Sequence, residues 1–294
     1  MRSGHVAIAG WTNVGKSTLI NRLVGEKIAA VAAVAQTTRH RITGVLNLPG
    51  RGQIVFVDTP GFHHARERMN RAMVDAAREA LTSVDLALLV VDAEHGEGRG
   101  DGEAAARVRE AGVPALAVLN KIDRVKPKSL LLPLMTTAVE RWGMKEAIPV
   151  SASTGEGCDV LVARILDYLP EGEPLFPEDF LTDQPERALA AEWVREKILH
   201  HTRQEIPHAA AVRVTAWRER EDGLVEIEAT ILVERDSQKG IVIGKGGSLL
   251  KTVGTEARAD IEALLDRRVF LSLRVDVSEG WRNDPGMIEE LGIG

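Results

Sequence analysis

The sequence contains a single cysteine, few aromatic residues and no long apolar run. The one cysteine, Cys158, excludes an intrachain disulfide framework and suits a reducing cytosol, where we interpret it as a passive thiol. Aromatic residues make up 4% of the chain, so aliphatic side chains must form most of the core. The longest plain apolar run, residues 28–35, is far shorter than the roughly 18 residues of a membrane span. We therefore expect no transmembrane segment and no signal peptide.

An excess of positive charge is missing as well. The net charge is −6 and the pI is near 5.8, which excludes a chain that binds nucleic acid through its overall charge. The length of 294 residues and the apolar content of 44% allow one large domain or two of ordinary size.

Residues 10–18 read Gly-Trp-Thr-Asn-Val-Gly-Lys-Ser-Thr, which fits the pattern G-x-x-x-x-G-K-[ST] of a phosphate-binding loop. A strand-like run precedes the loop and a helix-like run follows it, which favours a phosphate site over a glycine-rich turn that binds nothing. Main-chain N–H groups and the N-terminus of the helix then face the anion. We predict that Lys16 contacts the β- and γ-phosphates and that Ser17 ligates Mg²⁺. The other nucleotide contacts predicted in the loop are Gly10, Asn13, Val14, Gly15 and Thr18.

Strand-like and helix-like runs alternate through the first half of the chain. Strands are predicted at residues 6–9, 42–48, 53–58, 86–92, 115–120 and 148–150, with a hairpin turn over residues 49–52. Helices are predicted near residues 69–82, 101–111, 129–142 and 158–169. This alternation is typical of a doubly wound α/β sheet, whose functional loops lie beyond the carboxyl ends of the strands.

Three polar segments follow predicted strands where such loops are expected. They are Asp58-Thr59-Pro60-Gly61, Asn120-Lys121-Ile122-Asp123 and Ser151-Ala152-Ser153. Their order and spacing after the phosphate loop resemble the motifs of the translation-factor-like GTPases. Each segment is weak on its own, whereas four motifs in register predict a guanine-nucleotide site.

Each of these segments has a physical task in such a site. Asp58 is predicted to hold Mg²⁺ through water, and the Gly61 N–H to donate to the γ-phosphate. Asp123 offers two acceptors to the N1–H and the exocyclic amine of guanine, whereas adenine presents the wrong edge. Asn120 is expected either to contact the base or to brace the phosphate loop. The remaining contacts predicted are the Lys121 stem along the purine, the Ala152 N–H on guanine O6, and Thr59, Pro60, Ser151 and Ser153 beside them.

The region before the third strand carries Gln36-Thr37-Thr38-Arg39-His40. In GTPases this segment, the first switch, supplies a threonine that closes over Mg²⁺ and the γ-phosphate. Thr37 and Thr38 are both candidates. We predict Thr38, which forms the predicted catalytic set together with Lys16 and Gly61.

Phe62 stands where many regulatory GTPases carry a glutamine that orients the attacking water, and phenylalanine cannot do this. Catalysis must then come from a reshaped switch, a partner or a cation. Asn13 resembles the asparagine that ligates K⁺ beside the phosphates in some of these enzymes, so K⁺ is a candidate cofactor besides GTP or GDP and Mg²⁺. The alternative role of Asn13 is to brace the loop backbone.

The second half of the chain has no second phosphate loop, which argues against a tandem GTPase. Residues 173–185 are rich in proline and acids and predict a linker between a GTPase domain, residues 1–172, and a second domain, residues 186–294. The elements expected beyond the linker are a helix at 188–204, strands at 209–218 and 224–233, a helix at 249–265 and a strand at 269–277.

The run Ile-Gly-Lys-Gly-Gly at residues 243–247 fits the GXXG loop of a KH domain, in which glycines let the backbone of four nucleotides lie against the loop. The order helix–strand–strand–helix–helix–strand, with the loop between the two adjacent helices, suggests a smaller α+β domain, the type II KH arrangement. Residues 183–294 hold 16 basic and 21 acidic residues, but residues 237–255 contain three lysines and no acid, which favours a short single strand over a long duplex. The alternative is a glycine turn between two helices. The predicted RNA contacts are Lys239, Ile243, Gly244, Lys245, Gly246, Gly247 and Lys251.

One GTPase domain, a short linker and one C-terminal KH domain together resemble the Era family of bacterial GTPases over essentially the whole chain. The most specific stretches are residues 36–42, 58–61, 237–247 and 281–284, the last reading Trp-Arg-Asn-Asp. The resemblance implies binding to the 3′ end of small-subunit (16S) ribosomal RNA and a role in assembly and maturation of the small (30S) subunit. It also implies a cytoplasmic protein with partial, peripheral association with the inner face of the cell membrane. No DNA partner is expected.

Two departures from the family pattern leave the phosphate-binding positions intact. Trp11-Thr12 replaces the usual Arg-Pro, where a large aromatic ring could alter access to the nucleotide, and Ser153 is an uncommon third residue of its motif. Our prediction is a slow GTPase switch whose nucleotide state sets how the KH domain meets RNA. The alternatives are a KH-domain RNA chaperone in which GTP is structural, and a nucleotide kinase, which the guanine-specific Asp123 disfavours.

Overall fold

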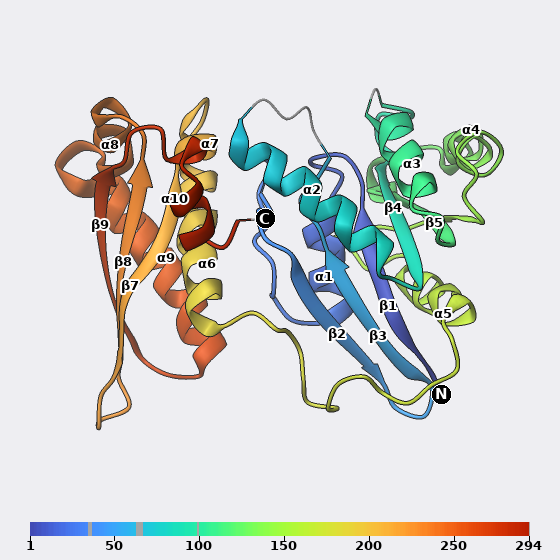
Figure 1. Cartoon of the computed structure of the whole chain (residues 1–294), viewed down its shortest axis with the longest axis horizontal. Coiled ribbons are helices and arrows are strands. Elements are labelled where there is room, and N and C mark those ends of the chain that lie inside the picture. The colour runs from blue at the N-terminus through green and yellow to red at the C-terminus, as the bar shows by residue number, and fades with distance from the viewer. Residues whose placement is uncertain (35–36, 63–66, 99, 294) are drawn as a thin grey trace.

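The computed structural model of the chain describes residues 1–34, 37–62, 67–98 and 100–293. Two sheets, each with its own helices, lie side by side along the long axis, and an extended segment joins them at one end (Figure 1). The C-terminal residues return to lie between the two units (Figure 1). The two units are therefore connected both by the linker and by a direct interface.

The first sheet has six strands in the order β2-β3-β1-β4-β5-β6. They are β1 (Arg2–Ala9), β2 (Ile42–Leu48), β3 (Gly52–Asp58), β4 (Leu86–Asp92), β5 (Ala115–Asn120) and β6 (Ala147–Pro149). All pairs are parallel except β2 with β3, so the predicted hairpin and the predicted doubly wound sheet are confirmed. β1 begins earlier than predicted because its polar first residues also pair with β3, with Arg2 opposite Gly52. β6 lies one residue earlier than predicted.

Helices cover both faces of this sheet, as a parallel sheet requires. On one face α1 (Lys16–Val24) and α5 (Cys158–Tyr168) pack on β1, β4 and β5. On the other face lie α2 (Arg68–Thr82), α3 (Asp101–Glu110) and α4 (Leu131–Thr136). The parallel strands are almost wholly buried between these two layers.

The helical stretch predicted near residues 129–142 is confirmed, but it is not one regular α-helix. The segment consists of a 3₁₀ turn (Lys128–Leu130), α4 and a π turn (Thr137–Arg141). The Trp142 N–H donates to the Thr137 carbonyl five residues back, and the wider turn leaves both Ala138 and Trp142 buried. Tertiary packing of Trp142 thus overrides the regular helical register.

The second unit has a three-stranded sheet in the order β7-β8-β9. Its elements are α6 (Glu186–His201), α7 (Ile206–Ala209), β7 (Ala211–Glu219), β8 (Val225–Val233), α8 (Asp236–Ile243), α9 (Ser248–Leu265), β9 (Val269–Val277) and α10 (Pro285–Glu290). β7 and β8 are antiparallel, whereas β8 and β9 are parallel because α8 and α9 form the crossover between them. The predicted order of helices and strands is confirmed, and α7 and α10 are additions. None of the helices in the described ranges is long and apolar enough to cross a bilayer.

The predicted linker is bound to the first sheet along its whole length. Gln53 Oε1 accepts from the N–H groups of Leu175 and Phe176 at 2.7 and 2.9 Å. The Val45 N–H donates to the Leu181 carbonyl at 2.9 Å, so the linker pairs with the outer edge of β2. These bonds hold the start of α6 at a fixed place beside the first switch.

Candidate nucleotide site and nucleic-acid interface

The loop between β1 and α1 adopts a backbone that demands glycine at two points. Gly10 has a φ of +149°, and a Cβ there would lie 2.3 Å from the Val90 carbonyl oxygen. Gly15 has a φ of +95°, and its Cβ would lie 2.4 Å from Asn120 Nδ2. Glycine at both positions lets the loop lie directly against the carboxyl ends of β4 and β5.

A cavity of about 330 Å³ opens beside this loop. Its lining joins the loop to residues 31–33 and to the first switch. The predicted nucleotide contacts that line it are Asn13, Gly15, Lys16, Ser17, Thr18, Thr38, Gly61 and Lys121. Thr59 and Pro60 do not line it, because both are buried and the Thr59 hydroxyl donates to the Ile8 carbonyl at 3.0 Å. The other predicted contacts that do not line it are Gly10, Val14, Asp58, Asn120, Asp123, Ser151, Ala152 and Ser153.

Lys16 is the cation at the centre of this cavity. Its Nζ donates to the carbonyl oxygens of Gly10 at 3.3 Å and of Trp11 at 3.0 Å, and only 7% of the residue is exposed. Burial lowers the pKa of Lys16 to about 8, and the nearby Asp58 carboxylate opposes that shift. The ammonium group is therefore still charged at neutral pH and attracts an anion into the cavity.

Ser17, Thr38 and Asp58 bring three oxygen-bearing side chains together. The Ser17 Oγ lies 2.7 Å from the Thr38 Oγ1, and the two hydroxyls lie 3.4 and 3.3 Å from Asp58 Oδ2. Burial raises the pKa of Asp58 to about 6, against the charge of Lys16. The other carboxylate oxygen, Oδ1, is buried without a hydrogen-bond partner among the described residues. Hard divalent cations prefer such oxygen ligands, so this set fits Mg²⁺.

The structure separates the two candidate threonines of the first switch. The Thr37 Oγ1 donates to the Val34 carbonyl at 2.7 Å, within its own loop. Thr38 is buried against Ser17 and Asp58. The geometry thus favours Thr38 as the metal ligand, in line with the prediction, while Gln36 of the same motif lies outside the described residues.

The segment after β3 places Gly61 beside Lys16, and a Cβ on Gly61 would lie 2.9 Å from the lysine Nζ. The next N–H, that of Phe62, donates to the Gly10 carbonyl at 3.1 Å. The Phe62 ring is 1% exposed and packs in the core beside α2 and α3, with the Arg107 guanidinium carbon 5.0 Å from its centroid. The ring therefore belongs to the core and not to the cavity lining. Residues 63–66 lie outside the described residues.

The motifs after β5 and β6 contact each other and the phosphate loop, and of their predicted nucleotide contacts Lys121 alone lines the cavity. Asn120 Nδ2 donates to the Val14 carbonyl at 2.9 Å, and its Oδ1 accepts from the Ala152 N–H at 3.0 Å. Of the two roles expected for Asn120, the structure shows the bracing one. The Ala152 N–H, which is predicted to donate to guanine O6, therefore donates to Asn120 in this structure.

Asp123 is held in place by the last motif. Ser151 Oγ donates to Asp123 Oδ1 at 2.7 Å and lies 3.0 Å from the Ser153 Oγ. The Ser151 hydrogen bond lowers the pKa of Asp123 below its ordinary value. The carboxylate is therefore ionised at neutral pH, and its exposed side is free to accept hydrogen bonds from a base.

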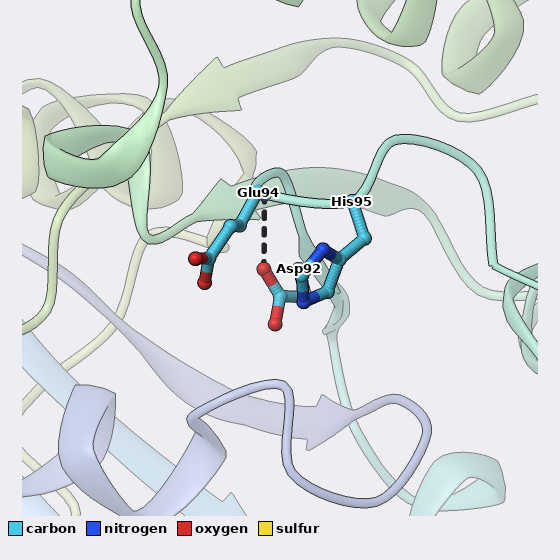
Figure 2. A group of neighbouring side chains, drawn as sticks. All are labelled: Asp92, Glu94 and His95. Atoms are coloured by element: carbon cyan, nitrogen blue, oxygen red, sulfur yellow. Dashed lines mark hydrogen bonds between the residues drawn. The ribbon is translucent and has the colours of Figure 1, made fainter.

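Lys121 pairs with an aspartate that lies outside the sequence motifs described above. Lys121 Nζ donates to the Asn13 carbonyl at 2.9 Å and pairs with Asp92 Oδ2 at 2.5 Å. Asp92 ends β4, so the rule that polar residues at carboxyl ends of strands form the site could have found it. Asp92 also stands with Glu94 and His95 in a group of possible metal ligands (Figure 2). Asp92 is already paired with Lys121, and Glu94 pairs with Arg124 at 3.0 Å, so this group supports the base end of the cavity.

Trp11 does not narrow the nucleotide cavity. A Cβ on Gly100 would come within 2.1 Å of the Trp11 ring, so the indole lies against the backbone before α3. The ring lines a separate hollow of about 340 Å³ together with Asp92 and Asp101. The tryptophan is therefore accommodated by glycine at position 100.

The GXXG loop lies between α8 and α9 with three left-handed glycines. Gly244, Gly246 and Gly247 have φ values of +74°, +60° and +80°. A hollow of about 400 Å³ runs from this loop between α9 and β9. It is lined by Gly247, Leu250, Lys251, Gly254, Thr255, Arg258, Phe270, Leu271 and Leu273.

Only part of the predicted RNA set lines this hollow. Gly247 and Lys251 do so, and Lys245 and Gly246 are exposed at the tip of the loop. Lys239 and Ile243 lie on α8 outside the lining. The residues that were missed on α9 recur every three or four positions from Gly247, so helical spacing alone could have identified that face.

Comparison with known proteins supports a GTPase domain followed by a KH domain. The family model for the 50S ribosome-binding GTPases matches residues 5–121, and the model for the KH domain matches residues 205–282. GTPase Era of Geobacter metallireducens is 49% identical over 292 residues, which cover 99% of this chain and 97% of that protein. The chain belongs to the Era family of GTPases.

Other Era proteins agree over their full length. GTPase Era of Trichlorobacter lovleyi is 50% identical over 300 residues, covering 99% of this chain and 97% of that protein. A crystal structure of Era in complex with MgGDPNP and nucleotides 1506–1542 of 16S ribosomal RNA superposes with a TM-score of 0.96 at 40% identity. An Aquifex aeolicus Era variant bound to GDP and AlF₄⁻ superposes with a TM-score of 0.95, also at 40% identity. Each of these two structures covers 99% of this chain and is itself covered to 99%.

Proposed function

We propose that this protein hydrolyses GTP and uses the nucleotide to control binding of the 3′ end of 16S ribosomal RNA during assembly of the small (30S) ribosomal subunit. The observation that carries the proposal is the cluster of Ser17, Thr38 and Asp58 at the phosphate loop, together with the guanine-type carboxylate of Asp123 that Ser151 holds in place. The full-length similarity to an Era structure that holds MgGDPNP and 16S RNA supports the same reading. We also propose the domain limits 1–172, 173–185 and 186–294, which the two separate sheets support.

The nucleotide roles follow from the positions of the side chains. The N–H groups of residues 13–18 and the Lys16 ammonium hold the phosphates, while the Gly61 N–H donates to the γ-phosphate. Ser17 and Thr38 ligate Mg²⁺ directly and Asp58 does so through water; the bound ion offsets negative charge as the phosphate bond breaks.

The guanine base is bound by the motifs that follow β5 and β6. Asp123 accepts two hydrogen bonds from guanine, with Ser151 fixing its orientation. The stem of Lys121 lies along the purine, and the Ala152 N–H donates to O6. Because these groups would be left unpaired by adenine, the site selects GTP over ATP.

A potassium ion is the cation we propose for catalysis. Phe62 is buried and offers no group to orient water. Asn13 lies at the cavity, with its amide nitrogen 3.3 Å from the Ala33 carbonyl, and residues 31–33 line the same wall. The asparagine oxygen and carbonyls of this wall are suitable ligands for a large monovalent cation beside the phosphates.

We therefore expect GTP turnover to be about tenfold faster in K⁺ than in Na⁺ at equal ionic strength, since a correctly placed cation stabilises the transition state. Steady-state hydrolysis in the two salts measures this. Replacing Asn13 by alanine should abolish the difference between the rates in the two salts. Equal rates of the unaltered protein in both salts would remove potassium from the mechanism.

RNA is proposed to bind along the hollow that starts at the GXXG loop. Lys239, Lys245 and Lys251 supply positive charge on an otherwise acidic domain, and the glycines at 244, 246 and 247 let the RNA backbone come close. Ile243 is proposed to contact a base beside them. The hollow suits single-stranded RNA, whose bases can enter between α9 and β9.

The decisive experiment is binding of an oligonucleotide that copies the 3′ end of 16S ribosomal RNA, measured with a GTP analogue and with GDP. We expect affinity at least about tenfold higher with the analogue, because a switch requires a difference in free energy between the two states. A duplex of the same sequence serves as the control ligand and should bind weakly in both states. Equal affinity with both nucleotides would leave an RNA chaperone in which GTP is structural.

The cellular location is a separate proposal that depends on family resemblance alone. We propose a cytoplasmic protein with peripheral contact to the inner face of the membrane. Sedimentation with vesicles that contain anionic lipid tests this contact, and a protein that stays in the supernatant at low salt would exclude it.

A further inference from the structure

Residues 37–40 of the first switch lie between the nucleotide cavity and the KH domain. Thr38 faces Ser17 and Asp58, as described above. Its neighbours face the other way: the Thr37 carbonyl accepts a hydrogen bond from the buried Arg195 of α6, and His40 Nδ1 lies 2.8 Å from the Gly292 carbonyl oxygen. The same four residues therefore contact both the metal ligands and the second domain.

Arg39 is the deepest of these contacts. It is 1% exposed, and its guanidinium donates to the carbonyls of Ala210 at 2.9 Å and of Pro207 and His208, both at 3.2 Å. The indole of Trp281 lies beneath it, with the guanidinium carbon 5.7 Å from the ring centroid.

These acceptors form the C-terminal end of α7. The last carbonyls of a helix have no partner within it and carry partial negative charge. Trp281 Nε1 donates to the Ala209 carbonyl at 2.9 Å, so Arg39 and Trp281 together bond four successive carbonyls, those of residues 207–210. A planar guanidinium can reach three of these at once, whereas the single ammonium of a lysine cannot.

Backbone carbonyl dipoles and the face of the Trp281 ring stabilise the positive charge of Arg39. Within the described part of the chain, its hydrogen bonds all go to backbone carbonyls and its Nε has no partner. Burial, followed by the charge of Arg195, lowers the pKa of Arg39 to about 9, so the side chain remains a cation at neutral pH. Carbonyl dipoles and the face of an aromatic ring stabilise a cation only when it is correctly oriented. The inserted side chain of Arg39 therefore fixes the position of the first-switch backbone.

The segment of the KH domain that contains Trp281 also contacts α2. Arg282 pairs with Glu67 at 2.9 Å, and Asn283 Oδ1 accepts from the Arg68 N–H at 3.2 Å. Met69 and Met73 of α2 are buried in one cluster with Trp281. Residues 281–283 thus contact the first switch through Arg39 and also the start of α2.

We propose that Arg39 is a positioning residue for GTP hydrolysis, which holds Thr38 over the metal by anchoring the first switch in the end of α7. The proposal deepens the proposed function and depends on it. Adjacent Cα atoms are 3.8 Å apart, so Thr38 can move little from Ser17 and Asp58 while Arg39 stays inserted. No described residue of the KH domain lines the nucleotide cavity, yet the domain completes the site through this anchor. By linkage, RNA that changes the position of α7 changes the affinity for the γ-phosphate.

The test compares Arg39→Met, which keeps the volume and removes the donors, with Trp281→Leu, which removes the ring from the KH side. We expect each variant to lower kcat about tenfold and to raise the Mg²⁺ concentration for half-maximal rate about tenfold. Affinity for GDP and the KM for GTP should stay within about threefold, because the base and diphosphate contacts are unchanged. Arg39→Lys should recover part of kcat.

Arg274→Met is the matched control, since Arg274 bonds Thr230 and lies near Asp276 within the KH domain, away from the switch. Its kcat and Mg²⁺ requirement should match those of the unaltered protein. A normal Mg²⁺ requirement in Arg39→Met would overturn the inference, as would a parallel loss of GDP affinity, which indicates a merely structural role. If Trp281→Leu does not fold, the two Arg39 variants decide. Failure of the proposed function itself looks different, because the unaltered protein then shows no hydrolysis or no nucleotide-dependent RNA binding.

Discussion

Replacing Asp123 by asparagine should weaken GTP binding by a factor of at least about 10³ and create affinity for xanthosine triphosphate. In the protein, Ser151 Oγ donates to Asp123 Oδ1 at 2.7 Å. An asparagine would turn its oxygen toward the Ser151 hydroxyl and its amide nitrogen toward the base. That nitrogen is a donor, and guanine presents only donors there, so two buried donors would oppose each other. Equilibrium binding of fluorescent GTP and XTP measures both effects.

Ser151→Ala is the matched control for this substitution. It removes the hydrogen bond that orients the carboxylate but leaves both acceptor oxygens, so we expect a loss of no more than about tenfold for GTP and no gain for XTP. Unaltered GTP affinity in Asp123→Asn would show that the base lies elsewhere. Loss of GTP without any gain of XTP would mean that the substitution disrupts the loop and does not reverse the recognition.

The residues that bind nucleotide could be predicted from sequence because their constraints are local. Gly10 and Gly15 need positive φ and no side chain, and such positions recur at fixed spacing in any loop of this shape. Asp58, Asn120 and Asp123 could be placed because each follows a buried apolar strand, and parallel strands bring their carboxyl ends to one edge. The preference for Thr38 over Thr37 came from the family pattern, and the geometry agrees with it.

The contacts across the two domains could not be predicted in this way. Nothing near Arg39 in the sequence indicates that its side chain reaches carbonyls about 170 residues further along the chain, because the contact exists only when both domains are folded. Asp92 was missed because an aspartate that ends a strand has many possible partners. The division of the helical stretch near residues 129–142 into 3₁₀, α and π turns could not be predicted, because apolar spacing indicates a helix whereas the burial of Trp142 decides the local register.

The KH loop is the other place where a change of sequence has a large expected effect. The double variant Lys245→Asp, Gly246→Asp changes the loop charge by three units where the RNA backbone is proposed to lie. Both residues are exposed, and nothing lies within 4 Å of a Cβ on Gly246, so the new side chains fit without a clash. Aspartate also tolerates the left-handed backbone at position 246 better than most residues. We expect RNA affinity to fall by a factor of at least about 10² at moderate salt, since phosphate contacts are lost and repulsion is added.

Fluorescence anisotropy with the 16S-type oligonucleotide measures this loss, and Lys126→Asp, which changes the charge by two units, is the control for a change of overall charge. Lys126 is exposed on the GTPase domain, distant in sequence from the GXXG loop, so its replacement should change RNA affinity by less than about threefold. GTP binding by the double variant should be unchanged because the nucleotide cavity lies in the other domain. If the double variant still binds RNA tightly while Lys126→Asp also has no effect, the RNA does not lie on the GXXG loop. A comparable loss in both variants would instead show that RNA affinity follows overall charge, and the hollow between α9 and β9 would no longer be its site.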